Sequence, residues 1–190
     1  MGAGKTLIAQ VFETLRIPVF NADAEANILS EKNPDVKASI KKLFGDDAYI
    51  NGTYNRKHIA SLIFTKPFLL AQLNAIIHPA VFKRFGEWAL EQGTAPYVMK
   101  EAAILFESGA DKTVDKIIFV SAPEQVRIER VKKRNPAWSG NDIERRMKTQ
   151  EPEELKLKHS DYIINNDGSQ FLLPQILGIH QQLLKETKKV

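Results

Sequence analysis

The strongest constraint on the fold lies at the start of the sequence, where a glycine-rich segment runs directly into a helical pattern. Residues 2–6 read Gly-Ala-Gly-Lys-Thr, and apolar residues then recur at helical spacing from Leu7 to Leu15. A glycine-rich turn that opens a helix presents backbone N–H groups and the positive end of the helix dipole to an anion. We therefore expect a helix from Lys5 to Leu15 that begins at a phosphate-binding loop.

Each residue type in this segment suits a nucleoside triphosphate. The segment is the second half of the pattern G-x-x-x-x-G-K-[ST]. The backbone of Gly2, Ala3 and Gly4 would surround the phosphates, Lys5 would act as the catalytic cation on the β- and γ-phosphates, and the Thr6 hydroxyl would hold Mg²⁺. We predict ATP and Mg²⁺ as ligands. The alternative is a flexible glycine-rich start without a ligand.

Short apolar runs alternate with helical patterns along the rest of the chain, which predicts an α/β fold with a parallel sheet core flanked by helices. Apart from a short hairpin, residues 24–92 read as helical. This stretch is too long for a single helical connection between two parallel strands, so we expect a substrate-binding insertion. The predicted strands are 19–21, 97–99, 117–120 and 162–164. The predicted organisation is a single domain over 1–190, with a nucleotide-binding core (1–23 and 93–190), the helical region 24–92 and a lid at 126–148.

Turn and cap residues predict where several elements begin. Asn33, Asn55 and Ser139 should cap helices, and Asn51-Gly52 should form a hairpin turn. Ser121 to Glu124 reads as a capping box with an early proline. Two longer helices are expected at residues 67–91, where Pro79 should kink or break the helix, and at 169–185.

Composition narrows the possible classes of protein. The 190 residues contain no cysteine, which excludes disulfides and thiolate metal sites. No apolar run approaches the roughly 20 residues of a membrane-spanning helix. The net charge of +4 is mild. We expect a cytoplasmic protein whose partner is a small molecule rather than nucleic acid or a membrane.

Positive charge gathers between Val126 and Lys148, where eight basic and three acidic residues give a local excess of +5. Arg130 and Arg134 share one helix face, and Arg145 and Arg146 follow a loop that contains proline and glycine. Guanidinium groups pair with phosphate oxygens and exclude water when they close over them. This pattern favours a lid. The alternative is a solvated helical hairpin with weak surface ion pairs.

Asp23 follows the short strand at 19–21, and ligands of parallel sheets bind beyond the carboxyl ends of strands. An aspartate there could orient a hydroxyl group and accept its proton during phosphoryl transfer. It could also be the N-cap of the following helix, and the two roles are compatible.

The ordered set of motifs resembles bacterial dephospho-CoA kinases across nearly the whole chain. The residues that carry the resemblance are Gly4-Lys5-Thr6, Asn21-Ala22-Asp23, Phe44-Gly45, Asn55-Arg56, His78-Pro79, Ile104 to Gly109, Gln125 with Arg130 and Arg134, Gln150, and Asp161 to Asn166. The resemblance implies a P-loop kinase fold with a helical acceptor-binding insertion and a basic lid. It also implies phosphorylation of the ribose 3′-hydroxyl of dephospho-CoA, the last step of coenzyme A synthesis.

The resemblance assigns roles to individual residues. Asp23 would be the catalytic base and would contact the acceptor, and Arg56 and His78 would fall near the acceptor pocket. Arg134 and Asn166 would fall near the nucleotide. His78 could instead be structural, and Glu107 is expected to hold a loop by hydrogen bonds rather than to take part in catalysis.

Three departures from the family pattern bear on these expectations. Asn21 replaces the first acid of the family's D-A-D, and Ala103 stands where the family has proline. By the resemblance, about ten residues that would form the first strand and the first half of the phosphate loop are missing. Without them we expect a displaced or empty loop and weak ATP binding. The remaining alternatives are another small P-loop kinase, for a nucleoside, nucleotide or sugar acid, and a non-catalytic module that binds nucleotide or nucleic acid.

Overall fold

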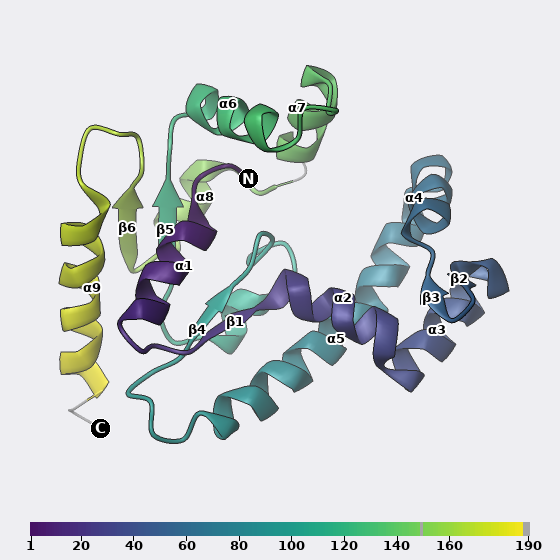
Figure 1. Cartoon of the computed structure of the whole chain (residues 1–190), viewed down its shortest axis with the longest axis horizontal. Helices are drawn as coiled ribbons and strands as arrows, with labels where there is room; N and C mark the ends of the chain where they lie inside the picture. Colours follow the sequence, from purple (N-terminus) through teal and green to yellow (C-terminus); the bar gives the residue numbers. More distant parts are fainter. Residues whose placement is uncertain (149, 188–190) are drawn as a thin grey trace. The chain divides into compact units, whose positions relative to one another are not determined.

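The computed structural model describes residues 1–148 and 150–187 of the chain. The chain divides into two compact units, whose elements are labelled in Figure 1. Unit 1 is Met1–Val19 with Thr94–Val190, and unit 2 is Phe20–Gly93. The polypeptide therefore leaves unit 1 once, forms unit 2, and returns.

Unit 1 contains the α/β part of the molecule. Its strands are β4 (Met99–Glu101), β5 (Ile118–Ser121) and β6 (Tyr162–Asn165). Its helices are α1 (Lys5–Thr14), α6 (Glu124–Arg134), α7 (Gly140–Lys148), α8 (Glu153–Lys158) and α9 (Leu172–Thr187), with a 3₁₀ turn at Ala110–Thr113. Strand β1 (Val19–Asn21) lies where the chain passes from unit 1 to unit 2, since Val19 belongs to unit 1 and Phe20 to unit 2.

Strands β5 and β6 pair in parallel, with Ile118 opposite Tyr162 and Val120 opposite Ile164. Asp161 fixes the start of this ladder. Its Oδ2 accepts the Ile117 N–H at 2.8 Å, and its Oδ1 accepts a hydrogen bond from the Lys116 ammonium at 3.1 Å. These two contacts lower the pKa of the Asp161 carboxyl below its ordinary value, and the hydrogen bond from Ile117 has the larger effect. The predicted α/β class, with parallel strands flanked by helices, is confirmed.

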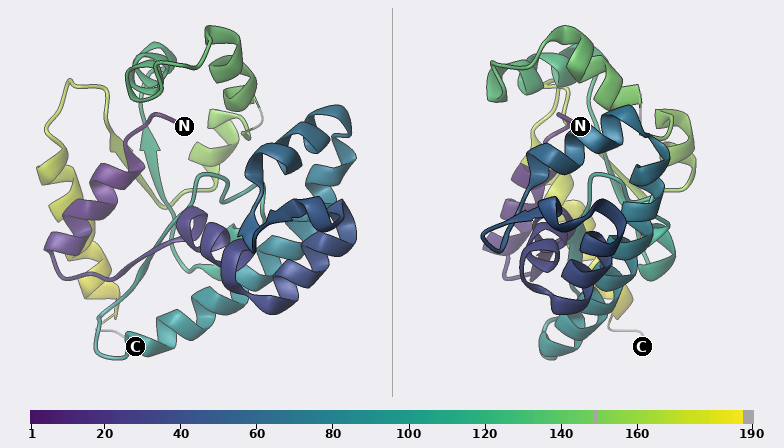
Figure 2. Two further views of the ribbon diagram at one scale, coloured as in Figure 1. Left: turned by 45° about the vertical axis from the view of Figure 1, so that its right-hand side comes forward. Right: turned by 90° about the vertical axis from the view of Figure 1, so that its right-hand side faces the viewer.

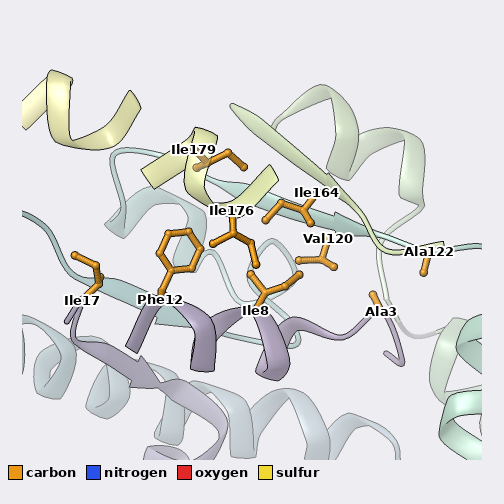
Figure 3. Close-up of a cluster of buried hydrophobic side chains, with 9 residues drawn as sticks. All are labelled: Ala3, Ile8, Phe12, Ile17, Val120, Ala122, Ile164, Ile176 and Ile179. Atoms are coloured by element: carbon orange, nitrogen blue, oxygen red, sulfur yellow. The ribbon is translucent and has the colours of Figure 1, made fainter. Parts of the chain in front are cut away.

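The core of unit 1 lies between α1, α9 and the β5–β6 pair (Figure 3). Ile8 and Phe12 project from α1 toward Ile176 on α9, and Ile164 on β6 lies beside them. Phe12, Ile164 and Ile176 have no exposed surface. Burial of such side chains contributes roughly 1.5–3 kcal/mol each, so α1 is held firmly where it follows the glycine-rich segment.

Unit 2 is mainly helical. It contains α2 (Ala22–Lys32), α3 (Pro34–Phe44), α4 (Arg56–Thr65) and α5 (Phe68–Glu91), with a 3₁₀ turn at Asp46–Ala48 and a hairpin of β2 (Tyr49–Ile50) and β3 (Thr53–Tyr54). Figure 2 shows α2, α3 and α5 lying side by side.

Local side-chain caps explain most helix starts in unit 2. The Asn33 side chain accepts N–H groups of Asp35 and Val36, and the Asn55 side chain accepts the His58 N–H. Both caps were predicted. The hairpin prediction is also confirmed, because Asn51 and Gly52 adopt φ of 49° and 80°. Two positive φ values are what a two-residue turn of this kind requires.

The core of unit 2 brings the hairpin and the helices together. Ile40 and Ala48 are fully buried, and the Tyr49 hydroxyl donates to the Ser30 carbonyl at 2.6 Å. At another place in the unit, the Trp88 ring lies 5.3 Å from the Phe20 ring and 6.2 Å from the Phe85 ring.

Several local predictions need correction. The segment from Ser121 to Glu124 is not a capping box: Pro123 is the N-cap residue of α6 without a side-chain hydrogen bond. Ser121 is the last residue of β5, and its hydroxyl donates to Glu153 instead. Pro79 does not break α5, which continues from Phe68 to Glu91 and packs against α2, α3 and α4. Helix α9 begins at Leu172 rather than at Ser169, and β4 lies two residues later than predicted.

Candidate nucleotide and acceptor sites

The glycine-rich segment forms a tight loop in which positions 2 and 4 accept only glycine. Gly2 and Gly4 have φ of 78° and 94°, a left-handed conformation that other residues rarely adopt. A Cβ on Gly4 would lie 2.3 Å from Asn166 Nδ2, and a Cβ on Gly2 would lie 2.5 Å from the Arg127 carbonyl oxygen. Lys5 is the first residue of α1. The loop therefore ends at a helix N-terminus, as a phosphate site requires.

Asn166, the residue that follows β6, holds the loop in place. Its Nδ2 donates to the Ala3 carbonyl at 2.7 Å, and its Oδ1 accepts a hydrogen bond from Arg130 Nη2 at 3.3 Å. Its own N–H donates to the Ser121 carbonyl at 2.8 Å. Asn166 is buried, with 9% of its surface exposed. The structure thus joins Asn166 to the glycine-rich loop.

A carboxylate that the sequence analysis did not single out lies beside the loop. The Thr6 hydroxyl donates to Glu101 Oε1 at 2.6 Å. Glu101 ends β4, so the carboxyl end of a strand meets the start of α1. The available signal was a glutamate at the end of an apolar strand, where ligands of parallel sheets bind.

The basic segment forms two helices, α6 and α7, with the connection between them; we call residues 124–148 the basic hairpin. Arg134 is exposed at the end of α6. Arg145 Nη2 donates to Asp142 at 3.1 Å, and the Arg146 guanidinium lies 4.3 Å from the centre of the Trp138 ring. Ser139 accepts the Asp142 N–H, so the predicted cap of α7 is confirmed.

A pocket of about 300 Å³ adjoins the loop. Its lining includes Ala3 and Lys5 of the loop region, Val120 of β5, and the charged residues Glu107, Arg127 and Lys156.

Glu107 Oε1 accepts the Glu151 N–H at 2.7 Å and lies 3.3 Å from Lys156 Nζ. These contacts tie the segment after β4 to the start of α8, which fits the expectation that Glu107 holds a loop.

The remaining predicted site residues belong to unit 2, on three different helices. Asp23 is exposed in the first turn of α2, whose N-cap is Asn21, so the alternative role of Asp23 as the cap is wrong. Arg56 opens α4, and its guanidinium lies 6.0 Å from the centre of the Tyr54 ring. His78 is half-buried in α5 beside Phe82, and burial lowers the pKa of its imidazole.

These features together define a P-loop nucleotide-binding fold. They are the two left-handed glycines, the helix that starts at Lys5, the parallel strand pair β5–β6 and the Glu101 carboxylate beside Thr6. Within this class, comparison with known proteins identifies the family. A family model described as dephospho-CoA kinase matches residues 1–171. The chain belongs to the dephospho-CoA kinase family, and the family predicted from the sequence motifs is confirmed.

Individual relatives agree with this assignment. A dephospho-CoA kinase from Porphyromonas gingivalis is 37% identical over 180 residues, which cover 94% of this chain and 88% of the relative. One from Salinibacter ruber is 38% identical over 173 residues, covering 89% and 86% of the two chains.

Solved structures show the same fold. A crystal structure of a Thermus thermophilus protein aligns with a TM-score of 0.80 at 31% identity and covers 98% of this chain and 93% of the other. A dephospho-CoA kinase from Campylobacter jejuni aligns with a TM-score of 0.71 at 21% identity, covering 98% and 94%, and supports the fold alone. Across the described residues, no helix is both long and apolar enough to cross a membrane.

Proposed function

We propose that this chain transfers the γ-phosphoryl group of ATP to the ribose 3′-hydroxyl of dephospho-CoA and so forms coenzyme A. The observation that carries the proposal is the glycine-rich segment 2–6, held by Asn166 and followed directly by α1, in a member of the dephospho-CoA kinase family. Kinases of this kind gain their rate from positioning and charge stabilisation, which are the functions that such a loop serves.

The loop side supplies the groups for the nucleotide. The loop N–H groups and Lys5 would bind the phosphates of ATP, since Lys5 stands at the N-terminus of α1. Arg134 of the basic hairpin, exposed at the end of α6, would add a guanidinium on the nucleotide side.

The residues present also fit Mg²⁺. The Thr6 hydroxyl and the Glu101 carboxylate, 2.6 Å apart, are hard oxygen donors. Mg²⁺ prefers such donors and is usually held by one or two protein groups with phosphate oxygens and water. Thr6 and Glu101 would hold the ion, which supplies charge neutralisation for the transferred phosphoryl group.

Unit 2 supplies the groups proposed for the acceptor. The 3′-oxygen forms a new bond to the γ-phosphorus as the bond to the ADP oxygen breaks, and the hydroxyl proton passes to the Asp23 carboxylate. Asp23 is suited to this role because it is exposed in the first turn of α2, where an acceptor can reach its carboxylate. Arg56 and His78 would bind the acceptor, the first as an exposed cation and the second as an imidazole that burial keeps neutral more readily.

The test is ADP release from Mg²⁺-ATP with and without dephospho-CoA, with the product identified by mass spectrometry and its phosphate position by NMR. We expect ADP release that depends on dephospho-CoA and a 3′-phosphate in the product. Nucleosides, nucleotides and sugar acids serve as competing acceptors. Faster transfer to one of these would overturn the acceptor assignment, and ATP binding without transfer to any acceptor would indicate a non-catalytic module.

Asp23→Asn tests the base. We expect a fall in kcat of about 10²–10⁴-fold with little change in the affinity for ATP. Asp35→Asn is the matched control, because Asp35 is also an exposed aspartate in the first turn of a helix of unit 2. Equal activity of the two variants would remove Asp23 from the mechanism.

A further inference from the structure

Helix α6 contacts the phosphate loop through the backbone of one residue. The Arg127 carbonyl oxygen would lie 2.5 Å from a Cβ at Gly2, and the Arg127 carbonyl carbon and Cα would each lie 3.0 Å from it. The loop backbone therefore rests directly on the α6 backbone. No side chain lies between them to absorb a movement, so a shift of α6 at this residue would move the loop with it.

The side chain of the same residue is fixed at its far end. Arg127 Nη2 lies 3.3 Å from Glu153 Oε2, with 19% and 34% of the two side chains exposed. Glu153 Oε1 accepts the Ser121 hydroxyl at 2.8 Å. Glu153 is the first residue of α8 and Ser121 is the last residue of β5. The Glu153 carboxylate thus links three elements: β5 through Ser121, α6 through Arg127, and α8, to which Glu153 itself belongs.

The hydrogen-bonding capacity of the Arg127 guanidinium is only partly satisfied. Its Nε is buried and has no hydrogen-bond partner among the described residues. A buried donor without a partner costs about 1–3 kcal/mol, so the arginine conformation depends on the contact with Glu153. Loss of Glu153 would leave a partly buried cation without its counter-charge, and α6 would shift to expose it.

We propose that Arg127 is a positioning residue for the nucleotide: its ion pair with Glu153 holds α6 where the Arg127 carbonyl supports Gly2, and so keeps the phosphate loop in its binding shape. The inference rests on the proposed function only for the identity of the nucleotide. It predicts that two side chains far apart in the sequence act as one unit on the loop. It assigns neither side chain a contact with the reacting atoms.

The test is the affinity for Mg²⁺-ATP, measured by calorimetry on the full chain, for Arg127→Gln, Glu153→Gln and the double variant. We expect each single change to weaken binding on the order of fivefold to tenfold, or about 1–1.4 kcal/mol. The double variant should lose no more than the worse single variant, because both changes break one contact. Arg127→Lys keeps a cation within reach of Glu153 and should recover part of the affinity.

The matched controls are Glu154→Gln, which removes an exposed neighbouring charge on α8, and Lys112→Gln, which removes an exposed positive charge from unit 1. Both should bind ATP as the unchanged chain does. The KM for dephospho-CoA should stay within about twofold in every variant, whereas a general loss of structure would raise both KM values.

The outcomes separate this inference from the proposed function. Arg127 and Glu153 variants that bind ATP normally would overturn the inference, even in an active kinase. Additive losses in the double variant would overturn it as well. Coupled losses of ATP affinity would support it even if dephospho-CoA were not phosphorylated, in which case the proposed function alone would fail.

Discussion

The candidate site of unit 1 and the helix caps of unit 2 depend on polar side chains that act over different distances along the chain. In unit 1 the hydrogen bonds that shape the candidate site join distant parts of the chain: Asn166 bonds to Ala3, and Thr6 bonds to Glu101. In unit 2 many polar side chains act within a few residues, as Asn33 and Asn55 do when they cap the helices that follow them. A change at the candidate site of unit 1 should therefore disturb several elements at once, whereas the loss of a helix cap in unit 2 should remain local.

The largest expected difference comes from placing alanine at a glycine of each unit. Gly4→Ala puts a methyl group 2.3 Å from Asn166 Nδ2 at a φ of 94°. We expect a loss of about 2–4 kcal/mol in the free energy of unfolding and at least a tenfold loss of ATP affinity. Urea denaturation and calorimetry measure the two effects.

Gly86→Ala is the counterpart in unit 2. Gly86 lies within α5, and a Cβ there would meet no atom within 4 Å. Alanine in a helix interior should stabilise the chain by up to about 1 kcal/mol. Equal changes in the free energy of unfolding for Gly4→Ala and Gly86→Ala would contradict the contrast between these two sites.

A smaller difference should separate two asparagines. Asn166→Ala removes two side-chain hydrogen bonds and leaves the buried Ala3 carbonyl without its donor, so we expect a loss of about 2–3 kcal/mol. Asn33→Ala removes a helix cap and should cost about 1 kcal/mol. Hydrogen exchange should show faster exchange at the phosphate loop, β5 and β6 in the first variant, and only near the start of α3 in the second. Equally local changes in both would contradict the comparison.

The smallest effect concerns the pH dependence of stability. Burial lowers the pKa of His78 below its ordinary 6.5, so the unfolded chain binds more protons just below that pH. The free energy of unfolding should therefore fall as pH falls through this range. His78→Gln should reduce the slope between pH 7 and 5, as measured by urea denaturation. An unchanged slope would contradict the expectation.

Asp161 of unit 1 should respond in a different pH range. Its pKa is lowered from 3.8, so its stabilising contribution is complete above that value and is lost as pH falls below it. The difference between Asp161→Asn and the unchanged chain should stay constant from pH 7 to 5. It should shrink only in stronger acid.

The difference between local and long-range contacts also explains which features could be predicted from the sequence. Caps, the Asn51-Gly52 turn and the helix after the glycine-rich segment depend on residues close in sequence, and these predictions are confirmed. The capping box at Ser121 failed because a distant carboxylate, Glu153, takes its hydroxyl group. Glu101 was missed for a similar reason, since its place beside Thr6 depends on how β4 packs against α1. The position of Asn166 near the nucleotide came from the family resemblance and stays a prediction, and only the structure shows that its side chain holds the Ala3 carbonyl.

The two tryptophans can serve as intrinsic fluorescence probes, because one lies in each unit. The chain has two tryptophans, Trp88 among the aromatic rings of unit 2 and Trp138 against Arg146 in the basic hairpin of unit 1. Replacing either one by phenylalanine leaves a single indole whose fluorescence reports on one unit. The emission of Trp138 depends on a guanidinium 4.3 Å from its ring, so titration with ATP would register any movement of the hairpin without an added dye.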